Sequence, residues 1–466
     1  MKRNKIATLY KHSEQFIDQN VHVAGWVKSL RKQKNMSFVD INDGSHIHSL
    51  QIVLEESKTT DYPQLIEEIK VGCSLRVQGN LQKSPGQKQF IELQGKQVQI
   101  IGNCPADTYP LQKKYHSFEF LRTIAHLRPR TNTGGAVARI RSQLAFATHA
   151  FFHKRGFLYL SSPILTSIDC EGAGELFQVT TLNLQNIQRT DTGSIEYSED
   201  FFKSPAYLTV SGQLNAESFA LALGDVYTFG PTFRAENSHT SRHLAEFWMI
   251  EPEMAFATLE DIQFLAEEYL KEMTKEILSH CKDDIAFFEK HIDKEIQRRL
   301  HNVIESTFTI ITYTEAISLL QKAPQAFVFP VKWGMDLQSE HERYLAESYF
   351  NAPICIINYP KDLKAFYMRD NEDGNTVSAM DIIVPKIGEI IGGSQREDRL
   401  DILTNKMTKQ ALSLEDYNWY LDLRRFGSAP HSGFGVGFER LIQFLTGIEN
   451  IREVSAFPRS PGHILF

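Results

Sequence analysis

The chain has 466 residues, of which 42% are hydrophobic and 23% are charged, a composition typical of a globular protein with two or three domains. No stretch approaches the ~18 apolar residues of a membrane span, and no apolar secretory segment follows the basic first residues, so we expect a cytoplasmic protein. The net charge of −7 argues against a polyanionic partner for the chain taken as a whole.

Short stretches that alternate apolar and polar residues at period two predict strands in the first part of the chain. They are residues 21–27, 37–41, 50–54, 74–78 and 90–93. One helical stretch, residues 63–70, precedes the fourth of them. Five strands with a helix in this place are typical of an oligonucleotide-binding (OB) β-barrel, which we expect over residues 1–102.

This first part is also basic, with 14 lysines and arginines against 10 aspartates and glutamates. It is therefore the candidate surface for a nucleic acid, although a solvated face without a partner has the same composition. OB barrels bind bases by aromatic stacking and phosphates by basic loops, and Phe38 lies beside Arg31, Lys32 and Lys34. The strand pattern alone, however, favours a core position for Phe38.

The next segment, residues 103–137, is rich in Pro, Lys, Arg and His with weak periodicity, which predicts a hinge. A second domain is expected over residues 138–466. Its first helix has an apolar face at helical spacing, made by Ile140, Leu144, Ala147 and Phe151. Gly156 can supply the left-handed residue after this helix, and residues 156–163 follow as an extended segment.

Another helix is predicted to begin at Thr258, whose hydroxyl can cap it while Asp261 lies near its positive end. Its apolar stripe consists of Ile262, Leu265, Tyr269, Met273 and Ile277. We expect a helical insertion over about residues 258–302. Short β-rich runs resume from Ala379 onward.

Two runs, each containing an arginine, indicate nucleotide chemistry. The first is Phe233-Arg234-Ala235-Glu236, and the second is Gly433-Phe434-Gly435-Val436-Gly437-Phe438-Glu439-Arg440. Arginine binds phosphate oxygens bidentately, so two arginines converging on one triphosphate could stabilise charge at its α-phosphorus. The glycines stand at every second position, unlike a GxGxxG fingerprint, and no P-loop sequence exists. Such alternation suits a strand lying flat against a planar ligand.

In this order, residues 156–163, 233–236 and 433–440 resemble motifs 1, 2 and 3 of the class II aminoacyl-tRNA synthetases. An OB barrel ahead of them is similar to the aspartate, asparagine and lysine subgroup, and the resemblance covers essentially the whole chain. It implies an α+β catalytic domain in which an antiparallel sheet is flanked by helices. It further implies ATP and Mg²⁺ as cofactors, and a homodimer formed through motif 1.

The resemblance also implies roles for individual residues. Arg234 would contact the α-phosphate and the amino-acid carboxylate, and Glu236 the adenine amino group. Phe247 would stack on adenine, His243 and Arg440 would hold the outer phosphates, and Glu389 would bind magnesium. Arg234 and Arg440 are thus the expected catalytic residues. Gly392 stands where related enzymes often have a metal-binding serine, which leaves the other magnesium ligands open.

The amino-acid pocket is argued to suit asparagine, with Gln213, Ala216, Glu251 and Arg396 as its residues. Aspartate enzymes of the subgroup have a lysine at the position of Ala216, so a cation for the substrate carboxylate is missing here. Arg396 resembles the arginine aimed at the side-chain oxygen. Glu251 could accept from the amide NH2 and repel a carboxylate, although it could instead bind the substrate ammonium. Residues 171–177 resemble an asparagine-type loop over the substrate.

In the barrel, Phe38, Gln51 and Glu92 resemble the subgroup's residues for the central uridine of the anticodon. We therefore expect ATP-dependent ligation of L-asparagine to tRNA(Asn) through an adenylate. The alternatives are an aspartate-specific or relaxed tRNA ligase, a ligase that amidates aspartate with ammonia, and a non-catalytic RNA-binding protein. The attached anticodon-type barrel argues against the amidating ligase.

Overall fold

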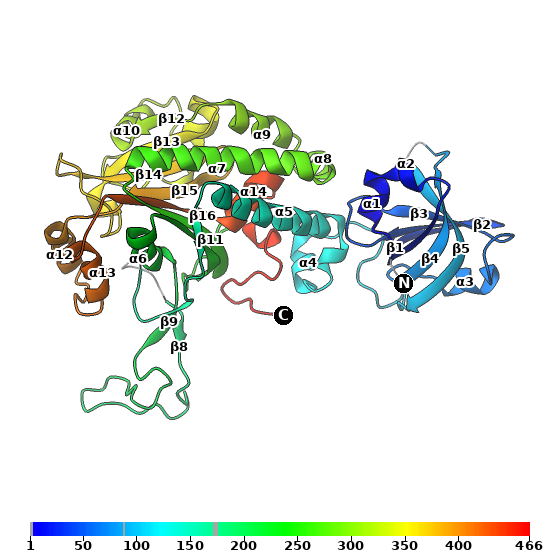
Figure 1. The fold of residues 1–466 in the computed structure, drawn as a ribbon, viewed down its shortest axis with the longest axis horizontal. Coiled ribbons are helices and arrows are strands. Elements are labelled where there is room, and N and C mark those ends of the chain that lie inside the picture. The colour runs from blue at the N-terminus through cyan, green and yellow to red at the C-terminus, as the bar shows by residue number, and fades with distance from the viewer. Residues whose placement is uncertain (1–2, 87–88, 171–175) are drawn as a thin grey trace. The chain divides into compact units, whose positions relative to one another are not determined.

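The computed structural model describes residues 3–86, 89–170 and 176–466. The chain divides into two compact units, Met1–Arg139 and Ile140–Phe466, whose helices and strands are labelled in Figure 1. Among the described residues, no helix combines the length and the apolar character needed to cross a bilayer.

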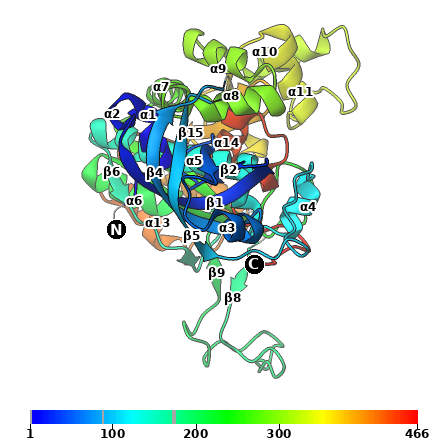
Figure 2. The same cartoon turned by 90° about the vertical axis from the view of Figure 1, so that its right-hand side faces the viewer.

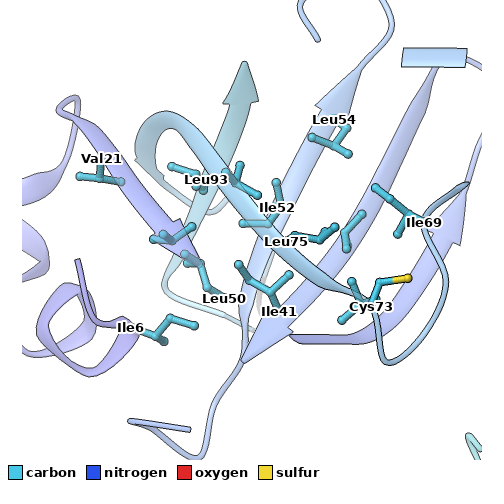
Figure 3. Packing of buried hydrophobic residues seen from close by; sticks show 14 of the residues in the cluster. Ile6, Val21, Ile41, Leu50, Ile52, Leu54, Ile69, Cys73, Leu75 and Leu93 are labelled. Carbon is cyan, nitrogen blue, oxygen red and sulfur yellow. The ribbon is translucent and has the colours of Figure 1, made fainter. Parts of the chain in front are cut away.

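The first unit contains a closed five-stranded barrel, in the strand order β1-β2-β3-β5-β4. Its strands are β1 (Asn20–Lys32), β2 (Met36–Asn42), β3 (Leu50–Glu55), β4 (Ser74–Lys83) and β5 (Ile91–Gly102). Neighbouring strands pair antiparallel, except that β3 and β5 are parallel. Alternate residues point into the barrel, where Figure 3 shows side chains such as Ile41, Ile52 and Leu75 converging. The predicted barrel is confirmed.

Short helices complete this unit. They are α1 (Ile6–Lys11), α2 (Ser13–Phe16), α3 (Tyr62–Glu68), α4 (Phe118–Thr123) and the 3-10 turn η1 (Arg128–Arg130). Ser117 caps α4 by accepting a hydrogen bond from the Phe120 N–H at 3.2 Å. Helix α5 (Asn132–Lys154) then runs across the boundary between the two units.

The second unit is built on an eight-stranded sheet, in the order β12-β13-β14-β15-β16-β11-β10-β6. Its strands are β6 (Leu158–Leu160), β10 (Asp225–Phe233), β11 (Glu246–Ala255), β12 (Thr309–Thr312), β13 (Ile354–Pro360), β14 (Thr376–Val384), β15 (Gly388–Gln395) and β16 (His431–Gly437). The central pairs are antiparallel, as expected, while β6 and β12 join the two edges in parallel. The sheet is therefore mixed rather than purely antiparallel.

Helices flank this sheet. They are α6 (Gln213–Leu223), α7 (Leu259–His280), α8 (Lys282–His291), α9 (Ile296–Glu305), α10 (Tyr313–Gln321), α11 (Ser339–Arg343), α12 (Leu400–Lys409), α13 (Asn418–Arg425) and α14 (Phe438–Thr446). Shorter turns are η2 (Tyr344–Tyr349), η3 (Lys361–Leu363) and η4 (Ile451–Glu453). Helix α7 runs along one face of the sheet (Figure 1) and has the predicted capping box of Thr258 and Asp261, with the predicted apolar stripe buried.

A small three-stranded sheet stands apart from the main one. It consists of β7 (Leu165–Thr166), β8 (Gln178–Val179) and β9 (Ala206–Leu208). The chain between β8 and β9 extends away from the main sheet in both views, Figure 1 and Figure 2. Asp200 organises this extension because its carboxylate accepts hydrogen bonds from the hydroxyls of Thr180 and Thr181, which hold its pKa well below the ordinary value.

Candidate functional site

The hairpin of β10 and β11 positions the first predicted arginine. Arg234 directly follows β10, and its backbone N–H donates to the carbonyl of Ala245 at 2.9 Å. Phe247 lies opposite Thr232 in the register of the two strands. This places the Arg234 guanidinium 5.4 Å from the centre of the Phe247 ring. A guanidinium cation and an aromatic face thus lie close together at neighbouring strands.

The second predicted arginine, Arg440, lies in the first turn of α14, directly after β16. Its Nη1 donates to the carbonyl of Glu389 at 3.0 Å and lies 3.6 Å from the carboxylate of the same residue. Glu439 beside it anchors the helix, because its carboxylate accepts from Arg141 at 2.6 Å and from the Trp248 N–H at 2.9 Å. The sequence run contained Glu439, but nothing in it indicated this anchoring role.

One cavity of about 170 Å³ collects the predicted nucleotide residues. Its lining includes Arg234, Glu236, His243, Phe247, Glu389 and Arg440. We call it the nucleotide cavity. Residues separated by more than two hundred positions in the sequence therefore surround one volume, because β15, β16 and β11 are neighbours in the sheet.

The environment of His243 in this cavity favours the neutral form of its imidazole. Burial lowers the pKa of His243. The carboxylate of Glu236 raises this pKa, whereas the nearby cations of Arg440 and Arg234 lower it further, and the net shift is downward. The imidazole Nε2 lies 3.9 Å from that carboxylate, and Nδ1 is 2.9 Å from the hydroxyl of Ser238. A neutral imidazole can still donate one hydrogen bond to a phosphate oxygen.

The glycines of β16 serve two different purposes. Gly435 and Gly437 line the nucleotide cavity, in agreement with a flat approach by a ligand. Gly433 instead makes room for protein, since a Cβ there would lie 2.2 to 2.5 Å from the Glu253 carboxylate. The expectation that the alternation serves a planar ligand is therefore wrong for Gly433.

Two further carboxylates lie close to Glu389, which lines the nucleotide cavity. A Cβ on Gly392 would lie 3.1 Å from Glu389 Oε1 and 3.3 Å from Asp381 Oδ1, so these two side chains converge. Glu342 accepts from the Glu389 N–H at 3.3 Å, and burial together with the charge of Glu389 raises the pKa of Glu342 to about 7. No motif in the sequence marks Asp381 or Glu342, and neither was predicted as a site residue.

Strand β11 leads from the nucleotide cavity to the predicted amino-acid residues. Phe247 and Glu251 are four residues apart and project from the same side of the strand, a separation of ~13 Å at the usual rise. Glu251 is buried, and its carboxylate accepts from the Gly212 N–H at 2.9 Å, the Thr228 hydroxyl at 3.0 Å and the Ser211 hydroxyl.

Arg396 is held by a second acid of β11. Its Nε donates to Glu253 Oε2 at 3.1 Å, its Nη2 to Oε1 of the same carboxylate, and its Nη1 to the Ser394 hydroxyl at 2.8 Å. Burial opposes this charge, but Glu253 raises the pKa of Arg396 above its ordinary value. These contacts use three of the five guanidinium donors.

Gln213 begins α6 and is fixed by a buried charge network. Its Nε2 donates to Glu217 Oε1 at 3.1 Å. Glu217 is fully buried and also accepts from Tyr420 at 2.7 Å, Arg424 at 2.8 Å and His431 at 3.0 Å. Burial opposes ionisation here, but Arg424 and His431 hold the pKa of Glu217 below its ordinary value.

Ala216, the fourth residue expected in the amino-acid pocket, lies in helix α6. It is fully buried and packs with Ala220, Val226 and Leu160 in a small apolar cluster. The loop expected over the substrate comprises residues 171–177. Its residues 171–175 lie outside the described residues, so only Leu176 and Phe177 are described.

The three predicted anticodon residues lie together on the barrel. Gln51 and Glu92 are partners in the parallel pair of β3 and β5, and Gln51 donates to Glu92 at 3.1 Å. Asp40, opposite Gln51, shares its face of β2 with Phe38. Phe38 is half-buried on the outer face of the barrel, where Arg31 lies 4.4 Å from its ring centre, so the core position favoured by strand pattern is wrong.

Two family profiles match the chain. Residues 118–461 match "tRNA synthetases class II (D, K and N)", and residues 21–101 match "OB-fold nucleic acid binding domain". Together these two matches cover nearly the whole sequence. They fall in the second and first units respectively, apart from the start of the longer match.

Individual relatives agree with these profiles over their full length. A protein of Protochlamydia amoebophila named asparagine–tRNA ligase is 58% identical over 446 residues, covering 96% of this chain and 95% of the relative. A Synechocystis protein of the same name is 56% identical over 461 residues, with 99% of both chains covered. The asparaginyl-tRNA synthetase of Pyrococcus horikoshii, solved with asparaginyl-adenylate, superposes with a TM-score of 0.87 at 31% identity, covering 100% of this chain and 99% of that one.

Proposed function

Because this chain belongs to the class II tRNA synthetases of the D, K and N group, we propose that it ligates L-asparagine to tRNA(Asn) at the expense of ATP. The family and the enzyme class expected from the sequence are confirmed. In the first step the carboxylate of asparagine attacks the α-phosphorus of ATP, and pyrophosphate leaves. In the second step the terminal ribose hydroxyl of the tRNA attacks the adenylate carbonyl, and AMP leaves.

The observation that carries this function is the nucleotide cavity, which Arg234 reaches from the end of β10 and Arg440 from the first turn of α14. In this proposal Arg234 binds the α-phosphate, where charge accumulates in the transition state. Arg440 holds the outer phosphates and so stabilises the departing pyrophosphate. Phe247 offers a face for adenine stacking, and Glu236 an acceptor for its amino group. Catalysis then depends on positioning and electrostatics, without a protein nucleophile.

Magnesium fits the carboxylate end of the same cavity. Glu389 lines the cavity and is 42% exposed, so it can reach a cation held by ATP. Asp381 converges on the same point and is a candidate second ligand, although Lys364 pairs with it at 2.8 Å. Two carboxylates with the remaining ligands from phosphates and water match the preference of Mg²⁺. When bound, the ion neutralises charge on the phosphate oxygens.

Selection of asparagine is assigned to Arg396, Glu251 and Gln213. Arg396 keeps donors for an amide oxygen, and the carboxylate of Glu251 can accept from an amide NH2 or from the substrate ammonium. Aspartate would bring a second negative charge into a site that already contains two buried acids, Glu251 and Glu253. A site built from such hydrogen bonds can discriminate by roughly 10⁴-fold.

The barrel is proposed to bind the anticodon, with Phe38 as a stacking surface and Gln51 and Glu92 as hydrogen-bonding partners of a base edge. Residues 1–102 would form this anticodon-binding domain, residues 103–137 a hinge, and residues 138–466 the catalytic domain with its helical insertion around 258–302. The half-exposed position of Phe38 supports stacking on an unpaired base.

We further propose a cytoplasmic homodimer formed through motif 1. Large apolar side chains near this motif are exposed in the single chain, with Phe146 at 71%, Leu158 at 50% and Tyr159 at 51%. Exposed apolar side chains of this size are common in subunit interfaces. The five cysteines are all free thiols, which suits a reducing compartment.

Asparagine-dependent ATP–pyrophosphate exchange tests the proposed reaction. The purified chain should catalyse exchange with asparagine and, at most weakly, with aspartate, and Arg234→Ala should abolish it. Arg298→Ala, which removes an exposed arginine on α9, is the control and should be neutral. Equal exchange with aspartate would instead favour the relaxed alternative, and no exchange with any amino acid would favour a non-catalytic RNA-binding protein.

A further inference from the structure

A second cavity, of about 650 Å³, adjoins the nucleotide cavity in the catalytic unit. Arg242 and Arg440 line both cavities, so they form a shared wall. Arg440 is the residue assigned above to the outer phosphates. The second cavity, which we call the basic cavity, therefore begins where the pyrophosphate end of bound ATP is expected.

The basic cavity is cationic although the chain as a whole is acidic, with a net charge of −7. Two carboxylates, Glu340 and Glu449, belong to its lining. They face five cationic side chains, which are Arg242, Arg299, Arg343, Lys386 and Arg440. A concave surface with such an excess of one sign attracts multiply charged ions of the other sign.

The acids that pair with these cations stand outside the cavity. Asp293 pairs with Arg299 at 2.7 Å and with Lys386 at 3.1 Å, and Glu347 pairs with Arg343 at 3.2 Å. Neither Asp293 nor Glu347 is part of the lining. The acids thus fix the positions of the cations without filling the space in front of them.

Arg299 gives independent support for a ligand. Its side chain is only 8% exposed, and its Nε finds no hydrogen-bond acceptor among the described residues. A buried guanidinium donor without an acceptor is costly in a folded protein. Glu340, one of the two acids of the lining, accepts hydrogen bonds from the N–H groups of Val328 at 3.1 Å and Phe329 at 2.6 Å instead.

We propose that the basic cavity is a binding site for short inorganic polyphosphates, which receives pyrophosphate as it leaves the nucleotide cavity. This role rests on the proposed function, because adenylate formation releases pyrophosphate beside Arg440. Arg440 and Arg242 can contact an anion on either side of the shared wall. Guanidinium groups suit the task because they bind phosphate oxygens bidentately.

The test uses tripolyphosphate as the probe and a variant that removes two half-exposed cations, Arg343→Gln with Lys386→Gln. Their side chains are 56% and 48% exposed, so the variant should fold, and an unchanged Tm verifies this. The matched control is Lys58→Gln with Arg298→Gln, which removes one lysine and one arginine that are 62% and 69% exposed and line neither cavity.

Calorimetric titration is made with a non-hydrolysable ATP analogue and asparagine already filling the reactive site. Wild type and control should bind one equivalent of tripolyphosphate, and the double variant should bind it at least about fivefold more weakly. In exchange assays the KM for pyrophosphate should rise by a similar factor. The KM values for ATP and asparagine should stay within about twofold.

Two results would overturn the inference: no tripolyphosphate binding to the filled wild-type enzyme, or equal binding by both variants. In either case intact asparagine-dependent exchange would show that only the role of the basic cavity is wrong. Absence of that exchange in the wild type would refute the proposed function itself, and with it the release of pyrophosphate at this place.

Discussion

Arg396 and Glu253 form a two-point ion pair between the end of β15 and β11, with the guanidinium 3% and the carboxylate 0% exposed. Removal of one partner leaves the other charge buried and unpaired. We therefore expect Glu253→Ala to lower the free energy of unfolding by about 3–5 kcal/mol. Urea denaturation measures this, and Glu295→Ala at the exposed Arg298 pair should cost less than about 1 kcal/mol. Similar losses in the two variants would contradict the assignment.

Gly433 and Gly435 offer a sharp comparison within one strand. A Cβ at Gly433 would lie 2.2 to 2.5 Å from the immobile Glu253 carboxylate, whereas one at Gly435 would lie 2.7 Å from the flexible end of Met249. Gly433→Ala should therefore lower stability by about 2 kcal/mol or more. Gly435→Ala should fold normally and raise the KM for ATP, because Gly435 lines the nucleotide cavity. Equal Tm values with equal KM values would refute both statements.

The packing of Ala216 limits which side chains can occupy this position, where aspartate enzymes of the subgroup have a lysine. A lysine here would enter the apolar cluster with Ala220 and Val226, so Ala216→Lys should cost about 1–3 kcal/mol of stability. It should also impair asparagine activation without creating efficient aspartate activation. Thermal unfolding and exchange with both amino acids measure this, with Ala216→Ser as the control. An Ala216→Lys enzyme of normal stability that prefers aspartate would show that one cation decides specificity.

Activity should be sensitive to Glu251→Gln, a substitution that removes the charge of this side chain and keeps its shape. Its carboxylate accepts from two hydroxyls and one backbone N–H, and Glu251→Gln would turn an NH2 group toward some of these donors. We expect kcat/KM for asparagine to fall by at least about 10²-fold. A smaller loss for asparagine than for aspartate would contradict amide recognition and favour contact with the ammonium.

Glu342 should make stability fall as pH rises. Burial, and then the charge of Glu389, raises its pKa from 4.5 to about 7, so the folded protein retains a proton that the unfolded chain has lost between these values. The contribution of Glu342 to the free energy of unfolding is therefore greatest below pH 4.5. It is lost as the pH rises through about 7. Glu342→Gln cannot ionise and should gain up to about 3 kcal/mol relative to wild type over that range, in magnesium-free buffer.

Glu340 provides the control of opposite sign for this pH series. The N–H of Phe329 holds its pKa below the ordinary value, so its contribution is present above that value and is lost as pH falls. Glu340→Gln should thus lose stability relative to wild type on the alkaline side. Urea unfolding across pH 4 to 8 measures both variants, and parallel curves for Glu342→Gln and wild type would refute the assignment.

The amino-acid sequence by itself determined most of the elements and indicated the residues that we propose for nucleotide binding. Period-two alternation is a local property, and it placed the barrel strands correctly to within a few residues at most ends. The box of Thr258 and Asp261 likewise fixed the start of α7. Residues of both arginine runs line the nucleotide cavity, and the family resemblance indicated the further lining residues His243, Phe247 and Glu389.

Only the tertiary structure decided which side chains meet. Arg396 and Glu253 are 143 residues apart in the sequence. They can pair because β15 and β11 lie on either side of the same strand, β16, in the sheet. The same order of strands places the Glu253 carboxylate against Gly433 and Asp381 close to Glu389. In the closed barrel, Phe38 lies on the outer face. Periodicity records which face of an element is apolar. It contains no information on the neighbour that each face receives, because strand order and register arise from packing of the whole chain.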